Sequence, residues 1–328
     1  MNAQAVPAGT YVVLSGGSGG VKLAVGLAQL LGERLSVIVN TGDDFTHLGL
    51  HISPDVDTVL YSLAGVVNEE TGWGRRNETW TFMRALGELG GPTWFKLGDG
   101  DLATHIDRAQ RLRAGETVTA VAAGQARALG VLPQILPMSD EPVRTVIDTD
   151  AGTLSFQEYF VREQSRPRLS GIRLEGIAAA RPTRQVLEAL SAPGLAGVIV
   201  GPSNPWLSVD PILAVPGMRA ALRAQGAPVI AISPIVGGKA VKGPTAKIMA
   251  EMGLDADCLT VARHYDGLID GFIIDDADAI LAKELKVPAL VTNTMMRSLD
   301  DKTALARQCL AFCERLVGTR AAGRRVRA

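Results

Sequence analysis

The fold is decided by the stretch Tyr11-Val-Val-Leu-Ser-Gly-Gly-Ser-Gly-Gly-Val-Lys22. A short apolar run ends in four glycines within five positions, and an amphipathic segment follows them. This pattern predicts a strand, a tight loop and a helix, because glycine lets backbone N–H groups come close to an anion at a helix N-terminus. The residues that we expect to bind phosphate are Gly16, Gly17, Ser18 and Gly19.

This glycine loop fits neither of the two standard nucleotide-binding patterns. Gly17 and Gly19 occupy the first two positions of the dinucleotide fingerprint, but Lys22 stands where its third glycine belongs. The second strand ends at Asn40, where that fingerprint requires an acid. The NTPase phosphate loop fails too, because Lys22 follows Val21 instead of a glycine. We therefore predict a phosphate loop of another kind, the alternative being a glycine-rich turn without a ligand.

A pair of acidic residues, Asp43 and Asp44, follows the second apolar run, Leu35–Val39. Hard oxygen ligands suit Mg²⁺, which proteins usually hold with one or two carboxylates and the phosphates of a substrate. A phosphate loop and a carboxylate pair at strand ends therefore predict a phosphorylated ligand with a divalent cation. The alternatives are that both acids are solvated on the surface or that they only begin a turn.

The composition is that of an ordinary globular protein of 328 residues, 47% hydrophobic and 20% charged, with a formal net charge of −1. The balanced charge argues against nucleic acid or an anionic membrane as a bulk partner, which leaves small-molecule substrates. We find no signal peptide and no apolar stretch long enough to span a bilayer. Three cysteines without a C-x-x-C pair argue against a zinc site, so we expect buried thiols in a cytoplasmic protein.

Short, continuously apolar strands alternate with helical patterns in the first and last parts of the chain. Such strands are typical of a parallel sheet covered on both faces, so we predict an α/β fold with a Rossmann-like parallel sheet flanked by helices. The predicted nucleotide-binding core is discontinuous and comprises residues 10–70 and 183–318. Residues 71–182 are predicted to be an inserted, mainly helical segment with a hairpin that turns at 150–152, and residues 319–328 a basic tail.

Several polar and aromatic residues are expected to have only structural roles. Thr183 and Thr245 are placed to cap the helices that follow them, and Asp275-Asp276 to open another helix. The last helix is expected at residues 301–317. Three tryptophans are expected in the core more than on a ligand platform, namely Trp73, Trp80 and Trp94.

Ligands of open parallel sheets bind outside the carboxyl ends of the strands. The loops after the predicted strands are rich in Gly, Ser, Asn, Asp and Lys, above all at residues 201–205 and 233–244. Such loops can hold a diphosphate through backbone N–H groups, a hydroxyl, an amide and an ammonium. The alternative for the first loop is plain turn chemistry. The residues that we predict to bind the diphosphate here are Gly201, Ser203, Asn204 and Lys242.

Eight segments of the chain, in this order, closely resemble the 2-phospho-L-lactate transferase family of deazaflavin coenzyme F-420 biosynthesis. The resemblance extends from residue 11 to about residue 295, and several of the segments match over eight or more positions. The segments are Leu14-Ser-Gly-Gly-Ser-Gly-Gly20, Asn40-Thr-Gly-Asp-Asp-Phe45, Pro54-Asp-Val-Asp-Thr58, Gly72-Trp-Gly74, residues 94–102, Met138-Ser-Asp-Glu-Pro-Val-Arg144, residues 201–211 and residues 233–244.

The resemblance implies transfer of a 2-phospholactyl or phosphoenolpyruvyl group from a guanosine-diphosphate-activated donor to the ribityl hydroxyl of 8-hydroxy-5-deazariboflavin, with release of GMP. It also implies a homodimer and a magnesium ion at Asp43 or Asp44. The diphosphate would lie across residues 16–20 and 201–204. The deazaflavin would lie between the core and the inserted segment, against residues 97–101 and the turn at Met138-Ser139. The residues that it implies around the deazaflavin are Leu97, Asp99, Met138 and Ser139.

No Ser-His-Asp or Cys-His nucleophile set is apparent in the sequence, so direct in-line transfer is expected instead of a covalent enzyme intermediate. Two other functions stay open. One is a regulator that binds a nucleotide sugar without catalysis, against which the Asp43-Asp44 pair and the acceptor segments argue. The other is a nicotinamide oxidoreductase, against which Lys22 and Asn40 argue.

Overall fold

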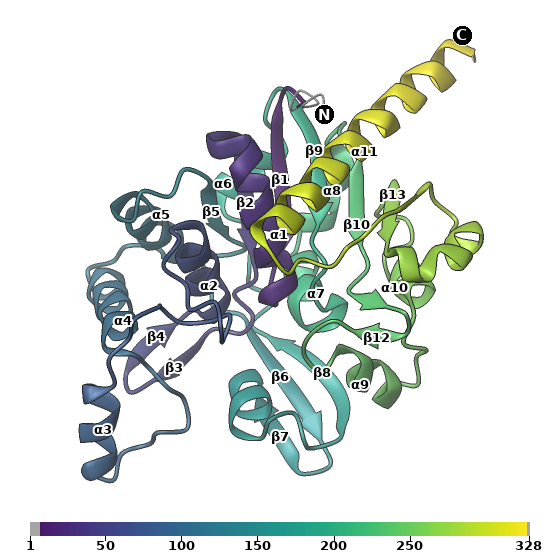
Figure 1. Cartoon of the computed structure of the whole chain (residues 1–328). Helices are drawn as coiled ribbons and strands as arrows, with labels where there is room; N and C mark the ends of the chain where they lie inside the picture. The colour runs from purple at the N-terminus through teal and green to yellow at the C-terminus, as the bar shows by residue number, and fades with distance from the viewer. Residues whose placement is uncertain (1–6, 327–328) are drawn as a thin grey trace.

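Figure 1 shows the computed structural model of the chain, which describes residues 7–326 and the side chains of residues 7–318. Within these residues a seven-stranded sheet forms the centre of the molecule, and all its strand pairs are parallel. The predicted α/β fold with a Rossmann-like parallel sheet is therefore confirmed. From one edge to the other the strands are β14 (Ala289–Val291), β13 (Gly271–Ile274), β10 (Val229–Ile232), β9 (Leu195–Val200), β1 (Thr10–Ser15), β2 (Leu35–Val39) and β5 (Gln134–Pro137).

Helices cover both faces of this sheet, as its apolar strands require. On one face, side chains such as Leu23, Val59 and Leu310 join the strands in one apolar cluster. On the other face, side chains such as Val186 and Leu222 build a second cluster. The first face carries α1 (Gly17–Leu31), α2 (Pro54–Leu63), α5 (Val118–Ala128) and α11 (Leu299–Val326), and the second α6 (Arg184–Leu190), α7 (Asp210–Ala214), α8 (Met218–Ala224) and α10 (Cys258–His264).

The order of the strands places a topological switch point at β1. The chain passes from β1 to β2 on one side, and it returns much later to β9 on the other side. Because parallel strands end at the same edge of a sheet, the loops after β1, β2 and β9 meet there. These loops contain residues 16–20, 40–44 and 201–204, which are the three segments predicted to bind the donor and the metal.

Residues 71–182, the expected insert, contribute one strand to the central sheet. This strand, β5, is an edge strand that pairs in parallel with β2 and places Ile135 opposite Val37. The prediction of a helical and hairpin insert is corrected in this respect. The rest of the segment forms helices and a small antiparallel sheet, seen at the bottom of Figure 1. These elements are α3 (Thr81–Glu88), α4 (Asp99–Arg113), β6 (Arg144–Thr149), β7 (Gly152–Ser155), η2 (Glu158–Arg162) and β8 (Leu169–Glu175).

The predicted helix starts differ in their outcome. Thr183 caps α6 by accepting a hydrogen bond from the N–H three residues on. Asp275 caps the 3-10 helix η4 (Asp276–Glu284) by accepting one from the N–H two residues on. Thr245 is not a cap, because Pro244 precedes it and Thr245 itself is the first residue of α9 (Thr245–Glu251). The short strands not yet given are β3 (Phe45–His47), β4 (Leu50–Ile52), β11 (Ile235–Val236) and β12 (Lys239–Ala240).

The C-terminal helix is longer than predicted, since the backbone of α11 continues to Val326. The side chains of the predicted basic tail, residues 319–328, lie outside the described residues. The three cysteines are buried and free, as expected. Among the helices of residues 7–326, none combines the length and the apolar character that crossing a bilayer requires.

Candidate active site

A cavity of about 660 Å³ lies where the loops after β1, β2 and β9 meet. Seven of the eight residues predicted to bind the donor line it. The exception is Gly201, which packs against the glycine loop: a Cβ added to it would lie 2.8 Å from the Cα of Gly20. The seven residues are Gly16, Gly17, Ser18, Gly19, Ser203, Asn204 and Lys242.

The glycine loop presents the N-terminus of α1 to this cavity. Gly17, the first residue of the helix, has a φ of +62°, a left-handed conformation that glycine adopts without strain. The N–H groups of the first helical turn have no acceptor within the helix. That of Gly17 donates to Asp55 Oδ1 at 2.9 Å, whereas Ser18 and Gly19 line the cavity. The loop therefore offers backbone donors and the positive end of a helix dipole to an anion.

The loop at residues 201–204 closes against the glycine loop. Ser203 Oγ accepts a hydrogen bond from the Gly20 N–H at 3.1 Å. A Cβ on Gly19 would lie 1.9 Å from the carbonyl oxygen of Pro202, so this close approach requires glycine. Asn204 Oδ1 accepts hydrogen bonds from the N–H groups of residues 206 and 207, but its Nδ2 is buried without a partner among the described residues. This amide nitrogen is a donor left over for a ligand.

Asp43 and Asp44 are buried, with 5% and 4% of their surfaces exposed, so they are not solvated surface acids. Oδ1 of each has no hydrogen-bond partner among the described residues. Only Asp43 lines the large cavity. Asp44 faces a smaller neighbouring cavity, and its Oδ2 accepts a hydrogen bond from Ser53 Oγ at 2.5 Å and lies 3.0 Å from His51 Nε2. Of the predicted pair, the structure thus brings Asp43 to the site and ties Asp44 to the end of β4.

A carboxylate that the sequence analysis did not assign, Asp55, joins Asp43 at the cavity. Asp55 lies in the first turn of α2, where its Oδ1 accepts the Gly17 N–H and its Oδ2 accepts a hydrogen bond from Asn40 Nδ2 at 3.0 Å. Burial raises the pKa of Asp55 to about 6. Burial and then the charge of Asp55 also raise the pKa of Asp43 well above its ordinary value. A buried and a half-buried carboxylate that repel each other in this way favour a cation beside them.

These residues fit a magnesium ion. Asp43 Oδ1 is buried without a hydrogen-bond partner, which is the state of an oxygen that a metal would occupy. Mg²⁺ usually takes one or two carboxylates and completes its shell with water and substrate phosphates. Within the described residues no cluster of three or more His, Cys, Asp or Glu could hold a metal alone. An ion at Asp43 and Asp55 would therefore be shared with phosphate groups on the neighbouring glycine loop.

Aromatic side chains from two elements face the cavity beyond the carboxylates. Trp94 and Phe95 precede α4, and Phe95 packs edge to face on Phe45 with 4.8 Å between the ring centroids. Phe156 and Phe160 lie at and after the end of β7, and their rings are stacked 5.4 Å apart with 10° between their planes. Flat apolar walls of this kind suit a planar ring system.

None of the four residues predicted around the deazaflavin lines the cavity. Asp99 instead caps α3, because its carboxylate accepts hydrogen bonds from Thr79 Oγ1 at 2.5 Å and from the N–H groups of residues 81 and 82. Leu97 is buried in a small apolar cluster with Ile52 and Met83. Both residues flank the start of α4, but their side chains are used to hold α3 and β4 in place.

The other two predicted acceptor residues follow β5. Met138 is buried in the core of the sheet, and the hydroxyl of Ser139 donates to Glu141 at 2.6 Å. The expected core positions of Trp73 and Trp80 are wrong as well, because these side chains are 47% and 44% exposed. Trp73 and Trp94 line the cavity, so two of the three tryptophans face the site.

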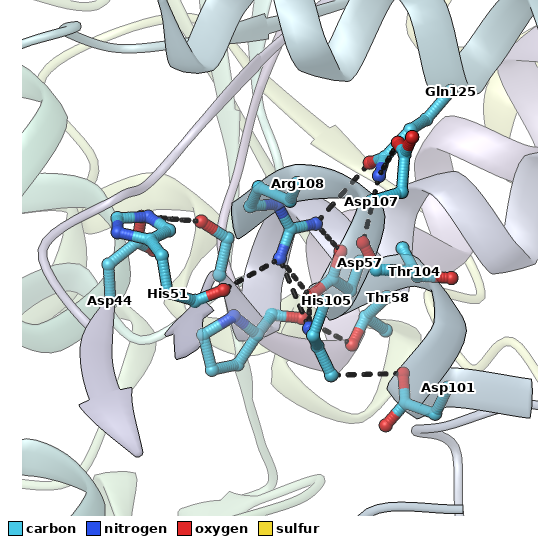
Figure 2. Close-up of polar contacts among 12 residues, drawn as sticks. Asp44, His51, Asp57, Thr58, Asp101, Thr104, His105, Asp107, Arg108 and Gln125 are labelled. Carbon is cyan, nitrogen blue, oxygen red and sulfur yellow. Dashed lines mark hydrogen bonds and ion pairs between the residues drawn. The ribbon is translucent and has the colours of Figure 1, made fainter. Parts of the chain in front are cut away.

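A buried polar network stands behind one wall of the cavity (Figure 2). The Arg108 side chain, in α4, donates to both carboxylate oxygens of Asp57 in α2. His105 Nδ1 lies 3.2 Å from an Arg108 nitrogen, and its Nε2 lies 3.3 Å from Asp101 Oδ1 as a charge contact without hydrogen-bond alignment. Asp101 Oδ1 also accepts a hydrogen bond from the Tyr61 hydroxyl at 2.7 Å. Asp57, Tyr61, Asp101 and His105 line the cavity. Asp57 and Asp101 lie within two of the family segments quoted above but were given no role of their own, and Tyr61 and His105 lie outside those segments.

The family model described as 2-phospho-L-lactate transferase CofD matches residues 11–314 of the chain. The chain belongs to the CofD family. The family inferred from the sequence motifs is therefore confirmed, and the match contains every residue of the cavity described above.

Two relatives and one solved structure show how far the likeness extends. The chain is 42% identical over 314 residues to the phosphoenolpyruvate transferase of Streptomyces griseus, covering 92% of this chain and 98% of that protein. It is 37% identical over 306 residues to the 2-phospho-L-lactate transferase of Methanocaldococcus jannaschii, covering 92% and 97%. A protein of the UPF0052 family from Bacillus halodurans superposes with a TM-score of 0.59 at 16% identity, over 93% of this chain and 99% of that one. This last likeness supports the fold alone.

Proposed function

We propose that this CofD-family protein transfers a phosphoenolpyruvyl or 2-phospholactyl group from a guanosine-diphosphate-activated donor to the ribityl hydroxyl of 8-hydroxy-5-deazariboflavin, releasing GMP. The observation that carries the proposal is the carboxylate pair of buried Asp43 and half-buried Asp55, which lines one cavity together with a phosphate loop and an aromatic wall. The names of the two relatives support the transferred group.

The donor diphosphate would lie against the N-terminus of α1 and the loop at residues 201–204. An anionic ligand in this position could accept hydrogen bonds from the backbone N–H groups of Ser18 and Gly19 and from the unpartnered Asn204 amide. Lys22 and Lys242 also line this end of the cavity, and two ammonium groups can balance the diphosphate charge. Transfer of a phosphoryl group depends mainly on such positioning and charge neutralisation.

The metal in this proposal is Mg²⁺, held by Asp43 and Asp55. When bound, Mg²⁺ supplies a positive charge that offsets the charge developing on the phosphate oxygens. Asp43 is buried and Asp55 is half-buried, and the hydrogen bonds from Gly17 and Asn40 fix the orientation of Asp55. Asp44 becomes a positioning residue that holds the turn through His51 and Ser53.

The deazaflavin ring would lie between the Trp94–Phe95 wall and the stacked Phe156 and Phe160, with its ribityl chain directed to the carboxylates. A bond forms between the ribityl oxygen and the phosphorus that carries the lactyl or enolpyruvyl group, and the bond from that phosphorus to GMP breaks. The hydroxyl proton passes to Asp43 or Asp55, the two carboxylates at this end of the cavity.

A turnover assay tests this function directly. Purified protein is mixed with Mg²⁺, 8-hydroxy-5-deazariboflavin and either the lactyl or the enolpyruvyl donor, and GMP and the mass of the deazaflavin product are measured. GMP and a phosphodiester product from one donor are expected. Donor binding without GMP release would instead indicate a nucleotide-binding regulator, and binding of NAD(P)H an oxidoreductase. A homodimer and a cytoplasmic location stay predictions.

Exchanging Asn204 for aspartate should weaken donor binding. The carboxylate of Asn204→Asp keeps the oxygen that accepts from residues 206 and 207, but it replaces the unpartnered amide nitrogen with an anionic oxygen. Losing a hydrogen bond to a charged group costs about 1.5–3 kcal/mol, so the affinity for GDP should fall by about 10- to 150-fold or more. Calorimetric titration of GDP into both proteins measures the change.

Asn293→Asp is the matched control for this substitution. Asn293 also accepts a backbone N–H through Oδ1, but it is exposed and does not line the cavity. Its exchange should leave GDP affinity within about 2-fold, since an exposed charge outside the cavity is screened by salt. Unchanged affinity in Asn204→Asp would show that the loop at 201–204 does not grip the donor.

A further inference from the structure

One wall of the cavity carries a carboxylate whose two oxygens differ in their surroundings. Asp101 Oδ1 accepts the Tyr61 hydroxyl at 2.7 Å and lies 3.3 Å from His105 Nε2. Figure 2 shows the other oxygen directed away from the network, and within residues 7–318 it takes part in no hydrogen bond. Asp101 is 7% exposed and lines the cavity. Because its Oδ1 is fixed by Tyr61 and His105, its second oxygen is an available hydrogen-bond acceptor in a fixed position.

The donor and acceptor roles of the neighbouring side chains decide which oxygen of Asp101 is occupied. Arg108 can only donate, so His105 Nδ1, 3.2 Å from the guanidinium, must be the acceptor and His105 carries its proton on Nε2. Nε2–H then faces Asp101 Oδ1. Both neighbours of Oδ1, Tyr61 and His105, therefore present protons to it, which leaves Oδ2 as the oxygen for a ligand.

The same network keeps Asp101 charged. Burial alone raises the pKa of a carboxyl group, but the contacts of Asp101 with His105 and Tyr61 outweigh burial and lower its pKa. Arg108 supplies the nearby positive charge and is itself paired with Asp57. A buried anion that is kept in this way on a cavity wall needs a function beyond the stability of the fold, because an apolar residue would be cheaper to bury.

We propose that Asp101 selects the acceptor by taking a hydrogen bond from the imide N–H on the pyrimidinedione edge of its planar ring. This inference rests on the proposed function. The imide keeps its proton at neutral pH, whereas a phenol conjugated with the ring system is acidic and its anion would be repelled by a carboxylate. The aromatic side chains of Trp94, Phe95 and Phe156 would then pack against the faces of the acceptor ring, while Asp101 accepts a hydrogen bond from the edge of that ring. Tyr61 and His105 are positioning residues.

The test uses the acceptor and an analogue methylated on the imide nitrogen, titrated by fluorescence into wild type, Asp101→Asn and Asp107→Asn with GDP and Mg²⁺ present. Wild type should bind the N-methyl analogue about 10- to 150-fold more weakly than the acceptor, the effect of one hydrogen bond to a charged group. In Asp101→Asn, the protons of Tyr61 and His105 hold the amide oxygen at the Oδ1 position, so its NH₂ faces the imide. The difference between the two ligands should then fall below about 3-fold.

Asp107→Asn is the control, because Asp107 lies on the same helix but bonds to Gln125 and does not line the cavity. It should discriminate like wild type. Tyr61→Phe provides a second variant should Asp101→Asn fail to fold, and it should weaken the discrimination by releasing Oδ1. The last ligand is an 8-methoxy analogue. Its affinity relative to the acceptor should be the same in wild type and in Asp101→Asn.

Several results would overturn the inference. If wild type and Asp101→Asn lost the same factor of affinity on going from the acceptor to the N-methyl analogue, Asp101 would not contact the imide. A loss with the 8-methoxy analogue that depends on Asp101 would place the phenol edge there instead. In both cases wild type still binds the acceptor and releases GMP, so the proposed function would stand. Absence of both binding and GMP release in wild type would reject the proposed function itself.

Discussion

Asp43→Asn should lower the rate of GMP release by about 10²- to 10³-fold and, without metal, raise the melting temperature. The loss of rate is expected because a ligand to the charge-neutralising ion is removed from a site where such electrostatic stabilisation supplies much of the catalysis. The gain in stability follows from the raised pKa of Asp43, which burial and the charge of Asp55 cause. Above the unfolded pKa, near 3.9, the ionised side chain destabilises the fold, and asparagine removes that charge.

The two effects are measured separately. GMP release is followed over a range of Mg²⁺ concentrations, and melting is followed by circular dichroism in EDTA at pH 7.5. Asp55→Asn should lower the rate in the same way but gain less stability, because both Asp55 oxygens accept hydrogen bonds and an amide has only one acceptor oxygen. Asp276→Asn, at an exposed acid in the first turn of η4, should change neither quantity. Near-normal turnover of Asp43→Asn at low Mg²⁺ would show that the metal is held elsewhere. A lower melting temperature in EDTA would show that Asp43 is not repelled in the metal-free fold.

The loops that we propose for the donor could be located from the sequence because their signal is local. The glycines at residues 16–20 and the loop at 201–204 each follow directly on a buried strand. In a parallel sheet the position of such a loop is fixed by the strand before it, so a correct prediction of β1 and β9 also placed their loops at one edge. Only the final contact, Gly19 against Pro202, needed the structure.

The residues that we propose for the acceptor could not be predicted from the sequence, because the direction of each side chain depends on how α4 is rotated about its axis. Asp99 and Asp101 are two residues apart at the start of α4, and two residues of an α-helix differ by about 200° around its axis. Asp99 consequently turns to α3 and caps it, while Asp101 turns to the cavity. The motif at residues 94–102 contains both acids, and nothing in its spacing says which of them faces a ligand.

Two further misses have tertiary causes. The strand β5 is short and lies at the sheet edge, so its four residues gave no signal apart from the helices around them. Asp55 was quoted only within the family segment at residues 54–58 and was given no role in the site. In the fold its carboxylate accepts the first N–H of another helix, α1, a contact across 38 residues. Such a contact has no local signature.

Arg108→Met should destabilise the protein by about 3–5 kcal/mol. The Arg108 side chain is buried, with 1% of its surface exposed, and its guanidinium donates to both oxygens of buried Asp57. Removing one partner of a buried ion pair leaves the other charge uncompensated, which typically costs this much. Arg108 also donates to the carbonyl oxygen of His51 at 3.3 Å, so α2, α4 and β4 should loosen together (Figure 2). Urea unfolding followed by circular dichroism measures the free energy.

Arg111→Met, on the same helix, is the control. It shows how much stability is lost when an arginine outside the buried ion pair is replaced. Arg111 also pairs with an acid, Glu116 at 2.6 Å, but the pair is largely solvated, so its loss should cost below about 1 kcal/mol. The double variant Arg108→Met/Asp57→Leu should recover part of the lost stability, because no unpaired charge remains at this position. Equal losses in the two single arginine variants would contradict the ion-pair explanation. So would a double variant less stable than Arg108→Met, because burial of the Asp57 charge would then not be the source of the cost.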